Sequence, residues 1–209
     1  MYQAKKPVTS AADLQGRLEP MHPSQVNKII DHVDDHVAAW LGATTFVSIA
    51  SCDAQGNMDV SPKGDPAGFI KVIDAKTLAI PDRIGNFRAD TFFNVLENPR
   101  VGMMCVVPKR KEVVRINGAA QVVRDDELLD LTTLKGHRPD FVLLLRVEEA
   151  FFHCGKAMIR SRMWQPDHWG SIEGLPSYPQ ALKDHGQMDE TPLSEIEERM
   201  IHNEADRLY

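Results

Sequence analysis

The sequence predicts a mainly β fold, an antiparallel barrel or sandwich with helices packed over its ends. Three observations carry this prediction. Six or seven segments are rich in β-branched residues and alternate apolar with polar side chains. Short turn signals join most of these segments, as in antiparallel hairpins. Helical segments do not alternate regularly with the strands, as they would in a parallel doubly wound sheet.

Composition narrows the class of protein. The chain has 209 residues, a net charge of -6, 43% hydrophobic and 26% charged residues, which is typical of a globular protein and not of a disordered chain. No apolar run approaches about 18 residues, and the polar start does not resemble a signal peptide, so we expect no membrane association. The acidic balance disfavours nucleic-acid binding. Three scattered cysteines, Cys52, Cys105 and Cys154, favour a reducing compartment, and we expect a cytoplasmic protein.

The N-terminal segment is predicted to be helical. A short helix is expected at 10–18. A longer one begins with Ser24 as N-cap and ends near Gly42, because a set of apolar residues follows helical spacing. This set is Val26, Ile30, Val33, Val37, Trp40 and Leu41.

The remaining elements follow in order. Strands are predicted at 44–51, 58–63, 69–73, 77–80, 100–107, 112–123 and 141–154, with helices at 87–96 and 125–134. After these come a short basic helix at 156–164, an irregular stretch at 165–186 and a last helix with a capping box at Ser194. We therefore predict a single domain, 1–209, in three parts. These are a helical segment at 1–42, a barrel at 43–154 and a covering segment with a helix at 155–209.

The most informative stretch leaves the fourth predicted strand and enters a helix. Asn86 can cap that helix, and the free N–H groups of its first turn then lie beside Arg83 and Arg88. Oriented N–H donors and guanidinium groups together are suited to a phosphate. The alternative is a surface loop in which the two arginines pair with Asp82 and Asp90.

Two further clusters are candidates for ligand contacts. Ser61, Lys63 and Asp65 supply a donor, a cation and an acceptor in a stretch of small and rigid residues, although an ordinary turn explains them as well. Further along, Lys156 and Arg160 share a helical face.

The basic cluster at Lys156 and Arg160 continues with Ser161 and Arg162, and Trp164, which follows, could stack on a planar ring. A solvated basic face with a core tryptophan is the alternative.

The sequence does not predict a metal site. His32 and His36 are spaced as two zinc ligands on a helix would be, with acidic neighbours. No third ligand follows at a fixed offset, so a polar helix flank is favoured. Motifs for dinucleotide binding, phosphate loops and nucleophile elbows are missing, and no catalytic residue can be assigned.

An ordered set of motifs resembles the pyridoxamine 5′-phosphate oxidase-like group of FMN-binding split barrels. The motifs are Ser-Pro-Lys-Gly-Asp-Pro at 61–66, Ile-Pro-Asp-Arg-Ile-Gly-Asn-Phe-Arg-Ala-Asp at 80–90, the segment at 94–102, Arg-Ile-Asn-Gly-Ala at 115–119, and His-Cys-Gly-Lys-Ala at 153–157 with Arg160, Ser161 and Trp164. The resemblance covers about 24–170 and is nearest to a branch of FMN-dependent enzymes of unknown substrate.

The resemblance implies a six-stranded antiparallel split barrel, with flanking helices, that forms a homodimer with FMN at the interface. It implies that Asn86 and Arg88 bind the FMN phosphate, with Arg83 just upstream. It places Ser61, Lys63 and Asp65 along the flavin ring and ribityl chain. The set Lys156, Arg160, Ser161 and Trp164 would close the site from the partner subunit.

The function expected from this resemblance is an FMN-dependent oxidoreductase that acts on a small organic substrate. One alternative is a module that binds flavin or haem without turnover. Another is a true pyridoxamine 5′-phosphate oxidase. Against the last, the C-terminal Glu-Phe-Trp-Gln and Arg-Leu-His motifs are absent, and Val113 stands where a glutamine is expected.

Overall fold

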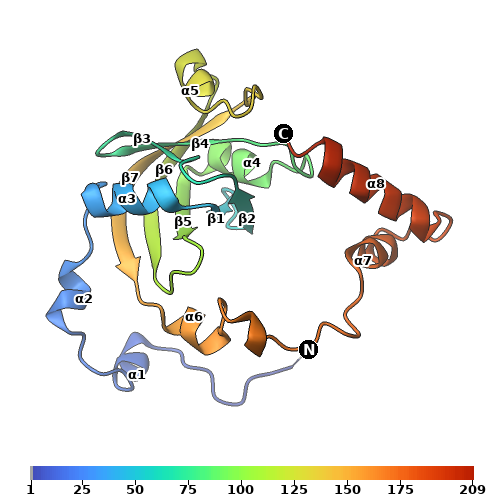
Figure 1. Cartoon of the computed structure of the whole chain (residues 1–209). Coiled ribbons are helices and arrows are strands. Elements are labelled where there is room, and N and C mark those ends of the chain that lie inside the picture. Colours follow the sequence, from blue (N-terminus) through green and yellow to red (C-terminus); the bar gives the residue numbers. More distant parts are fainter. Residues whose placement is uncertain (1) are drawn as a thin grey trace.

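The fold is one antiparallel sheet that coils into a barrel, with helices around it (Figure 1). The computed structural model describes residues 2–209. The strands are β1 (Phe46–Cys52), β2 (Met58–Gly64), β3 (Lys71–Asp74), β4 (Thr77–Pro81), β5 (Arg100–Val106), β6 (Val113–Val123) and β7 (Val142–His153). Their order in the sheet is β2-β1-β5-β6-β7-β4-β3. The mainly β, antiparallel split barrel is therefore confirmed.

The resemblance implies six strands, whereas the sheet has seven, as many as the segments predicted along the sequence. The shortest is β3, predicted at 69–73, which has four residues and pairs only with β4. A tight turn at Asp74 allows this short strand to form, since the Asp74 carboxylate accepts a hydrogen bond from the Lys76 N–H.

Alternation along the strands builds the core. In β1, Val47 and Ile49 are fully buried, whereas Phe46 lies on the outer face and is 43% exposed. The neighbouring strands place Cys105 and Val114 at the same level as Val47, and both are also buried. Each large apolar side chain buried in this way stabilises the fold by about 1.5–3 kcal/mol. Burial also raises the pKa of the Cys105 thiol to about 12, so this cysteine is a core residue and not a nucleophile.

The single long helix expected from Ser24 to Gly42 is wrong. The chain forms α2 (Pro23–Asn27) and α3 (Asp35–Ala43), and between them Ile30 adopts extended backbone and pairs with Ala150 of β7. The two N···O distances of this pair are 3.0 and 2.7 Å. The non-helical segment between α2 and α3 packs Ile30 and Val33 against the core, so the apolar spacing did not require one continuous helix. Asp34 caps α3 by accepting from the Val37 N–H at 2.8 Å.

The remaining helices surround the sheet. They are α1 (Ala11–Gln15), α4 (Asp90–Glu97), α5 (Asp126–Leu131), α6 (Lys156–Ser161), a 3-10 turn at Pro166–His168, α7 (Tyr178–His185) and α8 (Leu193–Asp206). The 165–186 stretch is thus partly helical rather than irregular, and Pro192, not Ser194, occupies the N-cap of α8. Helices α7 and α8 pack on each other to one side of the barrel (Figure 1). Across residues 2–209, no helix is long and apolar enough to cross a bilayer.

Candidate functional site

The loop at 82–89, between β4 and α4, holds the first predicted cation in an internal ion pair. Arg83 Nε donates to Asp65 Oδ2 at 2.7 Å, and Arg83 Nη2 donates to the Thr132 carbonyl at 2.9 Å. The Asp65 side chain is 1% exposed and that of Arg83 is 16% exposed. Asp65 follows β2 and Arg83 follows β4, so the pair ties together two strands that are not neighbours in the sheet. The pairing with Asp82, considered from the sequence, is replaced by this one.

Residues after α8 complete the network around Asp65. The Tyr209 hydroxyl donates to Asp65 Oδ1 at 3.1 Å, and its ring stacks on His137 with centroids 5.8 Å apart. Loss of solvent and the hydrogen bond to the Asp65 carboxylate both raise the pKa of Tyr209. Arg207 lies over the Phe87 ring at 5.3 Å. The segment at 207–209 therefore fastens the loop at 82–89 to the barrel, a contact that the sequence does not signal locally.

The start of α4 differs from the prediction, because Asn86 does not cap the helix. Its Oδ1 accepts from the Arg88 backbone N–H at 3.1 Å. The N-cap position is Ala89, which has a left-handed φ of 54° and supplies no side-chain bond to the first turn. Phe87 is left-handed as well, with φ of 60°. Left-handed backbone is strained for residues other than glycine, and such strain clusters at ligand sites.

Arg88 lies at this uncapped helix start. Its side chain is 71% exposed, and its Nε donates to Asp90 Oδ2 at 2.7 Å, as the alternative interpretation of the loop expected. Hydrogen bonding to Asp90 raises the pKa of Arg88. The guanidinium therefore remains a cation in water, within reach of the open first turn of α4.

One face of β2 turns toward α4. Asp59 Oδ2 accepts from the Thr91 hydroxyl at 3.3 Å, and Lys63 Nζ lies 5.4 Å from the centre of the Phe92 ring. Ser61 falls between them on the same half-buried face. Burial raises the pKa of Asp82, and the charge of Lys63 opposes that shift. The structure therefore gathers Ser61 and Lys63 near the helix start that carries Arg88.

The second predicted group lies elsewhere in the chain. Lys156, Arg160 and Ser161 belong to α6, and Trp164 Nε1 donates to the Arg110 carbonyl at 2.7 Å. Arg110 lies in the turn that begins β6, whereas the loop at 82–89 starts at the level where β6 ends. The register shows this, because Pro81 pairs with Val142 and Val142 pairs with Val123. One chain therefore does not bring the ten predicted residues together in one site.

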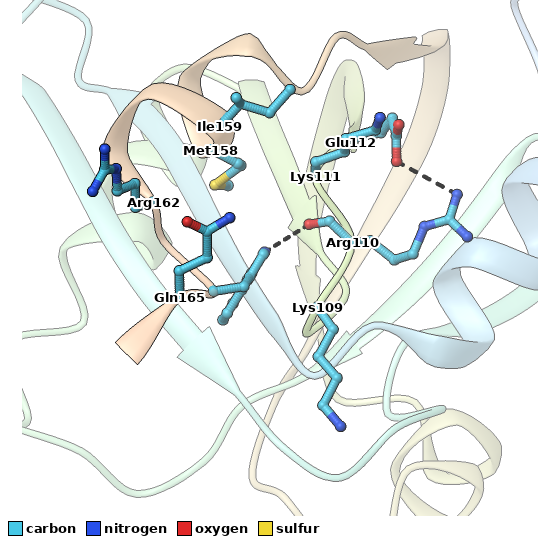
Figure 2. Close-up of a pocket in the computed structure, with 9 residues that line it drawn as sticks. Lys109, Arg110, Lys111, Glu112, Met158, Ile159, Arg162 and Gln165 are labelled. Carbon is cyan, nitrogen blue, oxygen red and sulfur yellow. Dashed lines mark hydrogen bonds and ion pairs between the residues drawn. The ribbon is translucent and has the colours of Figure 1, made fainter. Parts of the chain in front are cut away.

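A pocket of about 360 Å³ lies between α6 and the β5–β6 turn (Figure 2). Its lining residues are Lys109, Arg110, Lys111, Glu112, Met158, Ile159, Arg162, Trp164 and Gln165. Of these residues, only Arg162 and Trp164 belong to the clusters that the sequence suggested for ligand contacts. The run of three cations in a hairpin turn was visible there, but nothing local indicated that α6 would pack against it.

The two histidines that are spaced like zinc ligands on a helix do not share a helix. His32 precedes α3 and its Nδ1 contacts Asp31 Oδ1 at 3.0 Å, whereas His36 lies within α3. Hydrogen bonds from Lys76 and then His32 lower the pKa of Asp31 to about 2. In the part of the chain that the structure describes, no three His, Cys, Asp or Glu side chains are placed to hold a metal ion.

The chain belongs to the pyridoxamine 5′-phosphate oxidase family, whose family model matches residues 33–154, the span from just before α3 to the end of the barrel. The matched span includes β1 to β7 and the loop at 82–89. A comparison with curated proteins gave no match.

Solved structures resemble the barrel. A candidate pyridoxamine 5′-phosphate oxidase from Lactobacillus delbrueckii is 24% identical, with a TM-score of 0.47, over 58% of this chain and 95% of that one. An FMN-binding protein from Syntrophomonas wolfei is 16% identical (TM-score 0.41; 55% and 79% covered). The haem storage protein HutZ from Vibrio cholerae is also 16% identical (TM-score 0.39; 58% and 94% covered). None of the three is similar enough to indicate a cofactor or a reaction for this chain.

Proposed function

We propose that the chain is an FMN-binding flavoprotein that acts as an FMN-dependent oxidoreductase on a small organic substrate. The observation that carries this proposal is the uncapped, strained start of α4 beside the exposed Arg88. First-turn N–H groups without a side-chain cap, the positive end of the helix dipole and a guanidinium together suit a phosphate monoester. Membership of the pyridoxamine 5′-phosphate oxidase family supports FMN as the molecule that carries this phosphate.

The residues present fit such a group. Arg88 and the N–H groups at the start of α4 would hold the phosphate, and Asn86 would keep the Arg88 backbone in place through its hydrogen bond. Lys63 and Ser61, on the β2 face turned toward α4, would contact the flavin and favour its reduced, more negative form. The bound flavin would supply hydride or electron-pair transfer, and the protein controls position and access. Arg83 would act indirectly, by holding the loop at 82–89 to the barrel, because its guanidinium is paired with Asp65.

The FMN site is tested first by cofactor uptake. The purified chain should bind FMN and take on its yellow absorbance. Arg88→Ala should raise the Kd for FMN by about tenfold or more, because a charge-assisted contact to the phosphate is lost. Arg100→Ala is the matched control, since Arg100 is also exposed and paired with one carboxylate, Glu148. A chain that takes up no FMN, or an Arg88→Ala variant of unchanged affinity, contradicts the proposal.

Turnover separates the enzyme from a binding module. The FMN-loaded chain is mixed anaerobically with NADH, NADPH or dithionite. If the chain is an enzyme, NADH or NADPH should reduce the flavin rapidly. Reduction by dithionite alone would support a module that binds flavin without turnover, and a strong Soret band with haemin but no FMN uptake would support haem. Peroxide release from pyridoxamine 5′-phosphate would indicate a true oxidase of that substrate.

We further propose that the chain is a homodimer in which Lys156, Arg160, Ser161 and Trp164 reach the FMN of the partner subunit. Within one chain this group and Arg88 lie at different ends of β6, so a shared site requires a second copy. The outer face of β1, β2 and β5 supports association, because it exposes apolar side chains suited to an interface. These are Phe46, Met58, Val60 and Met104, which are 43%, 67%, 62% and 37% exposed.

Mixing two defective variants tests the shared site. Arg88→Ala and Arg160→Glu should each bind FMN weakly as pure proteins. After the two are unfolded together and refolded, about a quarter of the sites should regain normal affinity, because half of the dimers are mixed and each mixed dimer has one intact site. Refolding each variant alone is the control. No recovery on mixing would show that Arg160 and Arg88 do not serve one site across two subunits.

A further inference from the structure

The segment at 207–209, here the clasp, joins a loosely attached pair of helices to the candidate phosphate site. Helices α7 and α8 pack mainly on each other, and Figure 1 shows them to one side of the barrel. Ile196 is buried, but every other residue from 178 to 209 is at least partly exposed. After α8 the chain returns to the barrel, and the end marked C in Figure 1 lies close to α4. The clasp therefore attaches the α8 end of this helical pair.

One half of the clasp is Tyr209, which contacts the barrel through its hydroxyl and its ring. The hydroxyl donates at 3.1 Å to the Asp65 carboxylate, which is 1% exposed. The ring stacks on His137, and Lys135 Nζ lies 5.0 Å from the centre of the ring. These contacts are polar or cation–aromatic, and Tyr209 itself is half-buried. A segment held with so little buried apolar surface opens at a lower free energy than the core does.

The other half of the clasp is Arg207, which reaches the loop at 82–89. Its guanidinium lies 5.3 Å from the centre of the Phe87 ring, and Phe87 is 73% exposed. Residues 84–89 are all exposed, so the sheet does not enclose their side chains. Leu208, between the two halves of the clasp, is 62% exposed and adds no apolar anchor. An open clasp would therefore leave Phe87 in solvent and remove a support of the loop.

The candidate phosphate site depends on the conformation of this loop. Left-handed backbone at Phe87 and Ala89 leaves the first turn of α4 without a side-chain cap, and Asn86 Oδ1 accepts from the Arg88 N–H. Strained backbone of this kind persists only where the surrounding structure holds it. A site that is held in its binding conformation before the ligand arrives loses less entropy on binding. Loss of the clasp should therefore lower the affinity of the site without removing any group that touches the phosphate.

We propose that the clasp is a releasable positioning device for the loop at 82–89. The closed clasp holds the loop in its phosphate-binding conformation, and opening of the clasp loosens the loop and lets the phosphate leave. The inference rests on the proposed function for its ligand, FMN, whereas the hold of the clasp on the loop does not depend on FMN. Coupling between two sites is reciprocal. FMN bound at α4 should therefore also hold the clasp closed.

Hydrogen exchange of the full chain without FMN tests the hold on the loop. The variant Arg207→Gln/Tyr209→Phe should speed exchange in the peptide 84–93 by about fivefold or more, because it removes a contact at each half of the clasp. This peptide includes three amides that are hydrogen-bonded within the loop and the first turn of α4. The matched control is Tyr178→Phe/Arg199→Gln, which makes the same changes at exposed positions of α7 and α8. Unchanged exchange in 84–93, or an equal increase in the control, overturns the proposal.

Two single variants separate positioning from general stability. Arg207→Gln leaves the buried Asp65 bond intact, so exchange in 84–93 should still rise while the midpoint of thermal unfolding stays the same. Arg207→Lys keeps a cation beside the Phe87 ring and should restore most of the slower exchange. A rise that appears only together with a lower unfolding midpoint, or that lysine does not reverse, would show that the clasp does not position the loop.

Two measurements with FMN test the coupling. The variant Arg207→Gln/Tyr209→Phe should raise the Kd for FMN by about fivefold or more, mainly through faster release. In the unaltered chain, saturating FMN should slow exchange at the last turn of α8, where the Arg207 N–H donates to the Asn203 carbonyl at 3.2 Å. An unchanged Kd, or exchange at this turn that FMN does not alter, overturns the coupling even if Arg88→Ala weakens FMN binding. If the unaltered chain takes up no FMN, the proposed function fails, and exchange in 84–93 alone decides whether the clasp holds the loop.

Discussion

Replacing Gly118 by alanine should lower the free energy of unfolding by about 3 kcal/mol. Gly118 lies in the middle of β6, is buried and faces β7. An added Cβ would overlap the carbonyl group of Arg146 and come within 3.2 Å of Leu145 Cδ1. The first of these is backbone, which cannot move aside as the end of a flexible side chain can. The expected loss is therefore large for a change of one methyl group.

The cause is a bulge in the pairing of β6 with β7. Asn117 pairs with Glu149 and Gly118 pairs with Val147, so Glu148 has no partner on β6. Bulges bend a strand and bring its backbone close to the neighbour, and glycine permits that approach. Glu148 is directed outward, where it pairs with Arg100. Moving β7 to admit a Cβ would disturb the two longest strands of the sheet at once.

Gly42→Ala provides the matched control with the opposite sign. Gly42 lies within α3, is exposed, and an added Cβ would meet nothing within 4 Å. The same substitution in a helix should stabilise by about 0.5–1 kcal/mol. Urea unfolding followed by circular dichroism measures both values. Equal stability of the two variants would show that the close approach of β7 to Gly118 is not rigid.

Strand positions were predictable because the alternation of side chains is a local property. The expected ranges 58–63 and 112–123 differ from β2 and β6 by a single residue at one end. The helix expected from Ser24 failed for the opposite reason. Its middle is decided by pairing of Ile30 with Ala150, a contact between distant parts of the sequence that overrides helical spacing.

In the candidate site, too, local signals predicted some features, whereas contacts between distant parts of the sequence decided others. The position of the loop at 82–89, between a strand and a helix, followed from local signals around Pro81 and Asp90. The sequence did not indicate that Asp65 would hold Arg83, nor that Tyr209 would reach Asp65 from 144 residues away. Asn86 had the side chain of a helix cap but bonds the Arg88 N–H instead, because left-handed backbone at Phe87 and Ala89 delays the helix to Asp90.

Asp65→Ala should have the second large effect, a loss of about 3–5 kcal/mol in the free energy of unfolding. Both carboxylate oxygens are used, one by Arg83 and the other by Tyr209, and the side chain is almost completely buried. Removing it leaves the largely buried Arg83 guanidinium without a counter-charge. Asp130→Ala is the control, since Asp130 also pairs with an arginine, Arg138, but is 70% exposed, and no measurable change is expected.

A double variant then decides what Arg83 does. Asp65→Ala/Arg83→Met should regain part of the stability lost in Asp65→Ala, because the unpaired buried charge is gone and the methionine fills its space. If Arg83 serves only to tie the loop to the barrel, this double variant should bind FMN with nearly the affinity of the original chain, whereas Arg88→Ala should not. An equal loss of FMN affinity in both would instead make Arg83 a direct phosphate ligand. Urea unfolding and FMN titration of the same samples separate these two roles. A loss of FMN affinity caused by lower stability should disappear when stability is restored, whereas a loss caused by a missing phosphate ligand should persist.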